Sequence, residues 1–194
     1  MNITRSFFLA AAVVLVSVPA FAAPVTWTID PAHSSSNFSI KHMAVSTVRG
    51  ELGTTTGTIV YDAAAPEKST IEASIDVKTI STHNEKRDQH LNSPELFDTA
   101  KFPTATFKSI SVAKGAAGHW AVTGNLTMHG VTKSVVLDVE GPAAEQAHPM
   151  MKGTFVSGFI ATTTIKKEDF GLTYGGPMLG SDVKVELDIE VNRK

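Results

Sequence analysis

The sequence predicts an all-β domain of short antiparallel strands, arranged as a barrel or a sandwich. Apolar side chains recur at every second position through most of the chain, rather than at the 3.6-residue period of a helix. Gly and Pro separate these alternating stretches, which is typical of strands joined by tight turns. Two neighbouring stretches, 119–128 and 131–140, can also be aligned residue by residue into a hairpin.

The first 22 residues have the layout of a secretory signal peptide. Arg5 provides a positive start, residues 7–18 are apolar, and Ala20-Phe21-Ala22 matches a small-x-small cleavage site. The apolar run is shorter than the roughly 20 residues of a spanning helix, which favours cleavage over an uncleaved membrane anchor. Cleavage would leave one domain, residues 23–194, in the periplasm and without a transmembrane segment.

Composition limits the class of function. The chain has 17 basic and 19 acidic residues, and without Arg5 the net charge becomes −3 with His neutral. The basic residues are dispersed, whereas a nucleic-acid surface needs them clustered, so no nucleic-acid partner is expected. The absence of Cys excludes thiolate metal sites and Cys nucleophiles, and we expect no cofactor.

Several strands are expected before the hairpin. Residues 25–30, 34–41 and 47–61 are candidate strands, and Ile71, Ala73, Ile75 and Val77 alternate with polar residues in the next one. A further strand is expected at 102–112.

The segment 82–93 is the exception to the sheet. Thr82 and Glu85 have the spacing of a capping box, and Ser93-Pro94 is a plausible helix stop. The segment has almost no apolar face, so a helix here is either a solvated connector or a lid over a barrel mouth. In the lid arrangement, Leu91, Leu96, Phe97 and Phe102 would tuck the following loop against the barrel.

The hairpin turns at His129-Gly130, because Gly allows the positive φ of a two-residue turn. This register places Met128 opposite Val131, Leu126 opposite Lys133, Gly124 opposite Val135, Val122 opposite Leu137 and Trp120 opposite Val139. That face is apolar or Gly except for Lys133, and a slip of one residue would bury the polar face instead.

The last third of the chain continues the same pattern. Residues 141–152, with Pro142 and Pro149, are expected to form a surface loop, and 153–165 a strand. From Val183 to Val191 every second residue is apolar and the others are polar, as in a strand with one wet face.

Catalytic and metal motifs are weak. His83 and His90 lie seven residues apart, roughly 10 Å along a helix, which is too far to share a metal. His33 and His42 lie at opposite ends of one strand region, and no metal site is expected. No G-x-S-x-G elbow is present, which argues against a hydrolase of that type.

An eight-stranded barrel is just wide enough to be packed solid or to hold one small ligand. Periodicity does not choose between these two interiors. Small inward residues such as Gly124 would leave room for a ligand.

Four segments in order resemble the YceI-like family over essentially the whole mature chain. Residues 27–50 contain Trp-Thr-Ile-Asp-Pro-Ala-His-Ser and Phe-Ser-Ile-Lys-His-Met, and 87–107 contain Arg-Asp-Gln-His-Leu-Asn-Ser-Pro-Glu-Leu-Phe-Asp. Residues 124–137 contain Gly-Asn-Leu-Thr-Met-His-Gly-Val-Thr-Lys, and 168–172 read Glu-Asp-Phe-Gly-Leu. The chain departs from the family pattern at Leu96 and at Lys166-Lys167.

The resemblance implies a lipocalin-like antiparallel eight-stranded β-barrel with a short helical insertion near 82–93. It also implies a periplasmic protein that binds polyisoprenoids, such as a polyprenyl pyrophosphate or a prenyl quinone, and our leading hypothesis is a non-catalytic carrier of such a lipid. Some relatives are associated with fatty acids or their amides. Two other functions stay open, an enzyme acting on a lipid amide or ester and a stress or scaffold protein with a filled barrel. Paired edge strands would support a homodimer.

Two sets of residues are candidates for the ligand site. The apolar lining is expected from Phe38, Ile40, Ile75, Phe97, Phe107, Trp120, Val122, Leu126, Val135, Leu137, Phe159 and Phe170. Candidates for holding a polar head group are His42, Arg49, Arg87, His90 and Lys133.

Overall fold

A computed structural model describes residues 23–116 and 118–194. The expected signal peptide, residues 1–22, lies outside the described residues. Within those residues, no helix has both the length and the apolar character needed to cross a membrane.

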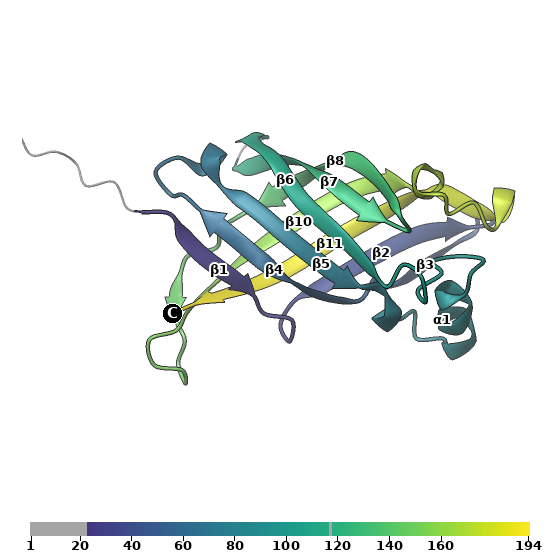
Figure 1. Cartoon of the computed structure of the whole chain (residues 1–194), viewed down its shortest axis with the longest axis horizontal. Helices are drawn as coiled ribbons and strands as arrows, with labels where there is room; N and C mark the ends of the chain where they lie inside the picture. The colour runs from purple at the N-terminus through teal and green to yellow at the C-terminus, as the bar shows by residue number, and fades with distance from the viewer. Residues whose placement is uncertain (1–22, 117) are drawn as a thin grey trace, which may run out of the picture.

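Eight antiparallel strands close into a barrel in the order β11-β1-β4-β5-β6-β7-β8-β10, and β10 pairs with β11 to complete the ring (Figure 1). This confirms the barrel rather than the sandwich. The ring strands are β1 (Val25–Ile29), β4 (Thr54–Tyr61), β5 (Thr70–Asp76), β6 (Thr104–Lys114), β7 (His119–Met128), β8 (Val131–Glu140), β10 (Phe155–Lys166) and β11 (Leu179–Arg193).

Three shorter strands extend the sheet: β2 (Ser35–His42), β3 (Ser46–Glu51) and β9 (Gln146–Ala147). The long strand β11 pairs with β2 along its first half and with β1 near its end. The predicted single strand 47–61 is interrupted at Leu52-Gly53. Gly53 adopts φ +141, and a Cβ there would lie 2.1 Å from the carbonyl oxygen of Asp76. At the break the pairing changes, because β3 pairs with β2 whereas β4 pairs with β1 and β5 in the ring.

The predicted hairpin register is confirmed pair for pair between β7 and β8. His129 and Gly130 both have positive φ, at 51° and 75°, which is the conformation of a type I′ turn. The expected space at Gly124 is not free, however. A Cβ on Gly124 would lie 2.3 Å from the ring of Phe107 on β6, so the absent side chain makes room for that ring.

One helix, α1 (Glu85–Asn92), lies at one end of the barrel beside the tips of β2 and β3 (Figure 1). Its N-cap is Asn84, whose side-chain oxygen accepts a hydrogen bond from the Arg87 N–H at 3.0 Å. Thr82 is therefore not the cap that its spacing from Glu85 suggested, because its hydroxyl bonds to Asp88 and Arg87 instead. The helix ends at the expected Ser93.

Four short 3-10 turns complete the connections: η1 (Pro66–Lys68), η2 (Val77–Thr79), η3 (Lys167–Phe170) and η4 (Gly176–Met178). The expected loop 141–152 contains β9, which pairs with the start of β10.

The buried apolar residues line the inside of the wall in three clusters rather than filling one central core. One cluster lies at the α1 end and includes Val77, Met128 and Phe170. A second contains Trp27, Ile59 and Val191, and the third Val122, Leu137 and Ala161 on β7, β8 and β10. The residues that alternate outward along β11, such as Lys184 and Glu186, are exposed.

Candidate functional site

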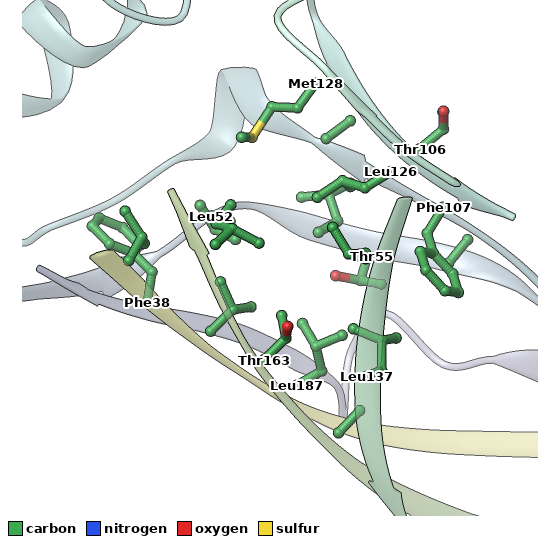
Figure 2. A pocket seen from close by; sticks show the side chains of 18 of the residues that line it. Phe38, Leu52, Thr55, Thr106, Phe107, Leu126, Met128, Leu137, Thr163 and Leu187 are labelled. Atoms are coloured by element: carbon green, nitrogen blue, oxygen red, sulfur yellow. The ribbon is translucent and has the colours of Figure 1, made fainter. Parts of the chain in front are cut away.

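The barrel encloses a cavity of about 610 Å³, within the range of pockets that hold small ligands. Each of the eight ring strands contributes lining residues, and nearly all of them are apolar. Figure 2 shows side chains from several strands, among them Phe38, Leu137 and Leu187, converging on this space. The interior is therefore hollow rather than packed solid.

The cavity brings together most of the residues expected to form an apolar lining. Those that line it are Phe38, Ile40, Ile75, Phe97, Phe107, Trp120, Val122, Leu126, Val135, Leu137 and Phe159. Phe170 does not. It is 1% exposed in the cluster at the α1 end, and its carbonyl oxygen lies 3.1 Å from Nδ1 of His129. The turn η3 directs this ring into packed side chains, where it fills space itself.

Small residues on the ring strands leave the space open. Ala73, Ala105 and Ala161 line the cavity from β5, β6 and β10. Thr55 on β4 and Thr163 on β10 add two further short side chains. Larger lining residues outside the sequence-based set include Leu52, Leu172, Tyr174, Met178 and Leu179. Apart from Leu179, the first residue of β11, these lie outside the strands, where a period-two pattern gives no orientation.

The two ends of the cavity differ in charge. Its lining includes His42, Arg87, His90 and Lys167 at the end where α1 lies. The opposite end is lined by uncharged side chains, namely Tyr61, Pro66, Ser69, Trp120 and Pro142. An elongated ligand with one polar end would therefore meet charged side chains only beside α1.

Two of the expected head-group residues lie elsewhere. Arg49 is exposed and borders a separate hollow with Lys184 and Glu186, because it alternates with the inward Val48 along β3. Lys133 belongs to the inward set of β8 but is exposed and does not line the cavity. A long aliphatic stem lets a Lys near a strand end carry its charge into water.

Thr82 joins the first turns of α1 to the segment before it, and the neighbouring Ser81 pairs with Glu51 at the end of β3. The Thr82 hydroxyl donates to Asp88 and accepts from Nε of Arg87 at 2.7 Å, while Nη2 of Arg87 donates to the Thr82 carbonyl at 2.9 Å. The Thr82 N–H also donates to Asp88, at 2.9 Å. These bonds fix the Arg87 guanidinium at the cavity edge and leave further N–H donors on it.

The helix and the segment after it cover the end of the cavity. Leu91, Leu96 and Phe97 line the cavity from this side. Nε2 of His90 lies 2.8 Å from a Glu95 carboxylate oxygen, and its ring meets that of Tyr174 edge-on at 4.7 Å. These contacts match the arrangement of a lid rather than that of a solvated connector, although Phe102 does not line the cavity.

Lys167 is 5% exposed and holds the loop 168–174, which borders the cavity at the same end as α1. Its Nζ donates to the carbonyl oxygens of Leu172 and Tyr174 at 3.1 and 3.2 Å and lies 2.7 Å from a Glu168 carboxylate oxygen. The hydrogen bond from Lys167, together with one from the Ser181 hydroxyl, lowers the pKa of Glu168 to about 2. The three donors of the ammonium are thus occupied, and Lys167 orders the loop 168–174.

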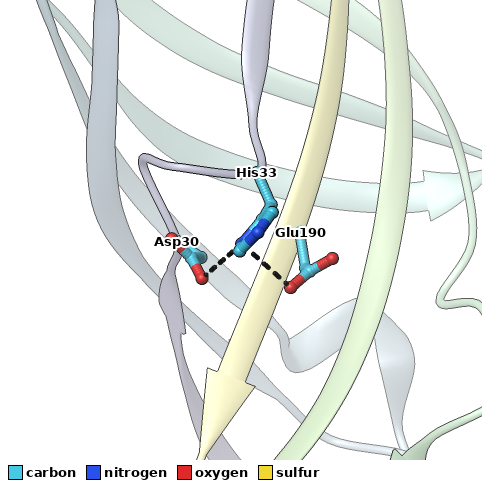
Figure 3. Close-up of side chains that lie close together, drawn as sticks. All are labelled: Asp30, His33 and Glu190. Atoms are coloured by element: carbon cyan, nitrogen blue, oxygen red, sulfur yellow. Dashed lines mark hydrogen bonds and ion pairs between the residues drawn. The ribbon is translucent and has the colours of Figure 1, made fainter.

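Outside the cavity, Asp30, His33 and Glu190 form a cluster that the sequence did not bring together (Figure 3). Nδ1 of His33 lies 3.0 Å from an Asp30 carboxylate oxygen and 3.6 Å from one of Glu190. Asp30 also accepts the Ala32 N–H at 2.9 Å. The cluster ties the turn between β1 and β2 to β11.

This cluster predicts a small pH dependence of stability. The hydrogen bond and charge of Asp30, with the charge of Glu190, raise the pKa of His33 above 6.5. The stabilising contribution should therefore be fully present below about pH 6.5 and lost as the pH rises through the raised pKa. Urea unfolding of the wild type and His33→Gln should show a difference in unfolding free energy that shrinks from about pH 6 to about pH 8. A difference that grows over this interval would contradict the assignment.

No Ser or Thr hydroxyl is hydrogen-bonded to a His ring within residues 23–116 and 118–194. The His rings with polar partners contact carboxylates, a carbonyl oxygen or backbone N–H groups, as for His148.

Comparison with known proteins identifies relatives over nearly the whole barrel. A family-wide sequence model for the YceI-like domain matches residues 27–191. A UPF0312 protein of Vibrio cholerae is 34% identical over 178 residues, covering 91% of this chain and 92% of that protein.

Two solved structures show the same fold. The Campylobacter jejuni YCEI protein superposes with a TM-score of 0.69 at 29% identity, covering 79% of this chain and 90% of that one. A polyisoprenoid binding domain from Saccharophagus degradans gives a TM-score of 0.62 at 17% identity, covering 87% and 98%. The second likeness is one of fold.

Proposed function

The chain belongs to the YceI-like domain family, and on that premise we propose that it is a non-catalytic carrier of a long-chain isoprenoid lipid. The tail occupies the barrel interior and the polar head lies beside α1. The observation that carries this proposal is the apolar cavity with charged lining residues at one end only. The description of the Saccharophagus degradans domain as polyisoprenoid binding is consistent with it.

The physical chemistry of a prenyl tail suits this interior. Such a tail has no directional polar groups, so its affinity depends on area, at about 25 cal/mol for each Å² removed from water. Side chains such as Phe38, Val122 and Leu187 supply that contact without demanding hydrogen bonds. Part of the gain is offset by the cost of ordering the tail.

The head group would meet cationic or donor side chains. Arg87 has two of its N–H positions engaged by Thr82, and the rest of its guanidinium can donate to a phosphate or a quinone oxygen. His42 and His90 line the same end and offer ring nitrogens. We further propose that the mature protein is periplasmic, because residues 1–22 have the layout of a secretory signal peptide.

A filled-barrel scaffold is disfavoured by the cavity. An enzyme acting on a lipid amide or ester would show product turnover that a single Ser or His substitution abolishes. The carrier should release its lipid chemically unchanged.

A chain-length series tests the proposal. Prenyl quinones of increasing tail length are titrated into the protein, and quenching of Trp120 fluorescence reports their arrival in the cavity. Affinity should rise by about 0.8 kcal/mol, roughly fourfold, for each buried carbon and level off once the tail outgrows the cavity.

Trp120→Phe is the control for the optical signal, since the other Trp, Trp27, does not line the cavity. Fatty acids of matched length test the preference for isoprenoids. Affinity that is independent of tail length, or no binding by any member of the series, would rule out the carrier.

A further inference from the structure

Two neighbouring loops at the α1 end form an uncharged tip. Residues 42–48 and 170–181 contain no Lys, Arg, Asp or Glu. The first loop joins β2 to β3 and the second precedes β11, and the Met43 N–H donates to the Met178 carbonyl oxygen at 2.6 Å. We call Met43, Ala44, Val45, Tyr174, Pro177 and Met178 the apex. It lies at the same end of the barrel as α1 (Figure 1).

The apex exposes large apolar side chains to solvent. Val45 is 86% exposed, Met43 57% and Met178 53%. Met43 and Ala44 have positive φ values of 51° and 56°, a conformation that costs a non-Gly residue energy. A tight hairpin turn requires this backbone conformation, and Asn, Asp or Gly usually occupy such positions, whereas here the turn presents Met43 and Ala44 to solvent.

The apex is continuous with the lip of the cavity. Tyr174 and Met178 line the cavity, as do His42 and Ser46 at the base of the β2–β3 turn. A hydrocarbon chain that leaves the cavity past the apex would stay in contact with these apolar side chains until it entered an apolar phase adjoining the apex. In bulk water the same passage would expose the whole tail.

The charge distribution matches a lipid bilayer rather than a water-exposed surface. Charged residues begin immediately behind the loops, with Lys41 and Arg49 on β2 and β3 and Asp182 on β11. This arrangement lets the apex enter the acyl boundary while the charges remain at the head-group level. Tyr174 adds an aromatic side chain of the kind enriched at that boundary.

We propose that the apex docks on a lipid bilayer, so that the lipid passes directly between the bilayer and the cavity. Docking stands on the exposed, uncharged loops alone, whereas passage of lipid rests on the proposed function.

Flotation with phosphatidylcholine vesicles measures docking, and uptake of a long-tailed prenyl quinone from the same vesicles measures passage. The apex variant is Met43→Asp with Val45→Asp. Neither residue lines the cavity, and Asp tolerates the positive φ at position 43 better than most residues. Met150→Asp with Met151→Asp is the matched control, because those side chains are 88% and 47% exposed in the loop at the opposite end of the barrel (Figure 1).

The apex variant should lose at least about tenfold in vesicle binding and in uptake rate, since charged side chains are costly within the acyl region. It should bind a short-tailed, water-soluble prenyl quinone as the wild type does, and the control variant should behave as the wild type throughout.

Three results would overturn docking: a wild type that does not bind vesicles, an equal loss in the control variant, or an apex that instead joins two copies. Sedimentation reveals the last as a dimer that the apex variant dissociates without any change in vesicle binding. If the wild type binds vesicles but no form binds any prenyl quinone, short-tailed or long-tailed, the proposed function fails while docking stands.

Discussion

Replacing Thr163 by Trp is expected to weaken binding of a long-tailed prenyl quinone by roughly 60-fold. Thr163 on β10 is one of the side chains that Figure 2 shows in the cavity. An indole there would displace about 100 Å² of lipid contact, which corresponds to about 2.5 kcal/mol and hence to that change in Kd. Equilibrium titration by Trp fluorescence or calorimetry measures the loss.

Thr162→Trp is the matched control, because Thr162 is adjacent on the same strand but exposed on the outer face. It should bind the quinone as the wild type does. Thermal unfolding of both variants checks that the barrel is intact, since overpacking alone can cost about 1–3 kcal/mol. Equal affinity of a folded Thr163→Trp protein and the wild type would mean that the tail does not enter this part of the barrel.

Replacing Lys167 by Met is expected to lower the free energy of unfolding by about 2–3 kcal/mol. The change keeps the aliphatic stem but removes the ammonium from the carbonyl oxygens of Leu172 and Tyr174. Buried acceptors left without donors carry a desolvation cost of this size. Urea unfolding at neutral pH measures it.

Lys166→Met is the matched control, because Lys166 is the residue next to Lys167, at the end of β10. Lys166 is 62% exposed and pairs with Asp182 at 3.0 Å on the surface, so its loss should cost less than about 1 kcal/mol. The pKa of Glu168 should also rise in Lys167→Met, because its first hydrogen-bond donor is gone. Wild-type stability from Glu168 is present above about pH 4.5 and is lost towards pH 2, so this acid-side loss should be smaller in the variant. Equal destabilisation by both Met substitutions would contradict the role given to Lys167.

The strands and their pairing were accessible from the sequence because alternation fixes which side chains face inward. The β7–β8 hairpin is the clearest case, since Trp120 through Met128 and Val131 through Val139 are complementary in only one register. The same alternation placed Phe38, Ile40 and Leu137 on the cavity wall.

The remaining features depend on packing between distant segments. Phe170 lies in a 3-10 turn, where no period-two pattern tells which way a ring points. Gly124 looked like free space because the ring that lies over it, that of Phe107 on the adjacent strand, could not be identified before β6 was paired with β7. Two other features also depend on residues that are distant in the sequence. Gly53 packs against the backbone of Asp76, and His90 of the lid contacts Tyr174.

The central claim is that the barrel holds a long isoprenoid tail. It is tested most directly by identifying the lipid that remains bound to the protein when it is purified from cells. The wild type and Thr163→Trp are purified without detergent, and native mass spectrometry measures the mass of each protein with any bound lipid. The proteins are then denatured, and the extracted lipid is identified. We predict a long-chain isoprenoid bound to the wild type and depleted from Thr163→Trp. A wild-type protein that yields no lipid and takes up no prenyl quinone would contradict the claim.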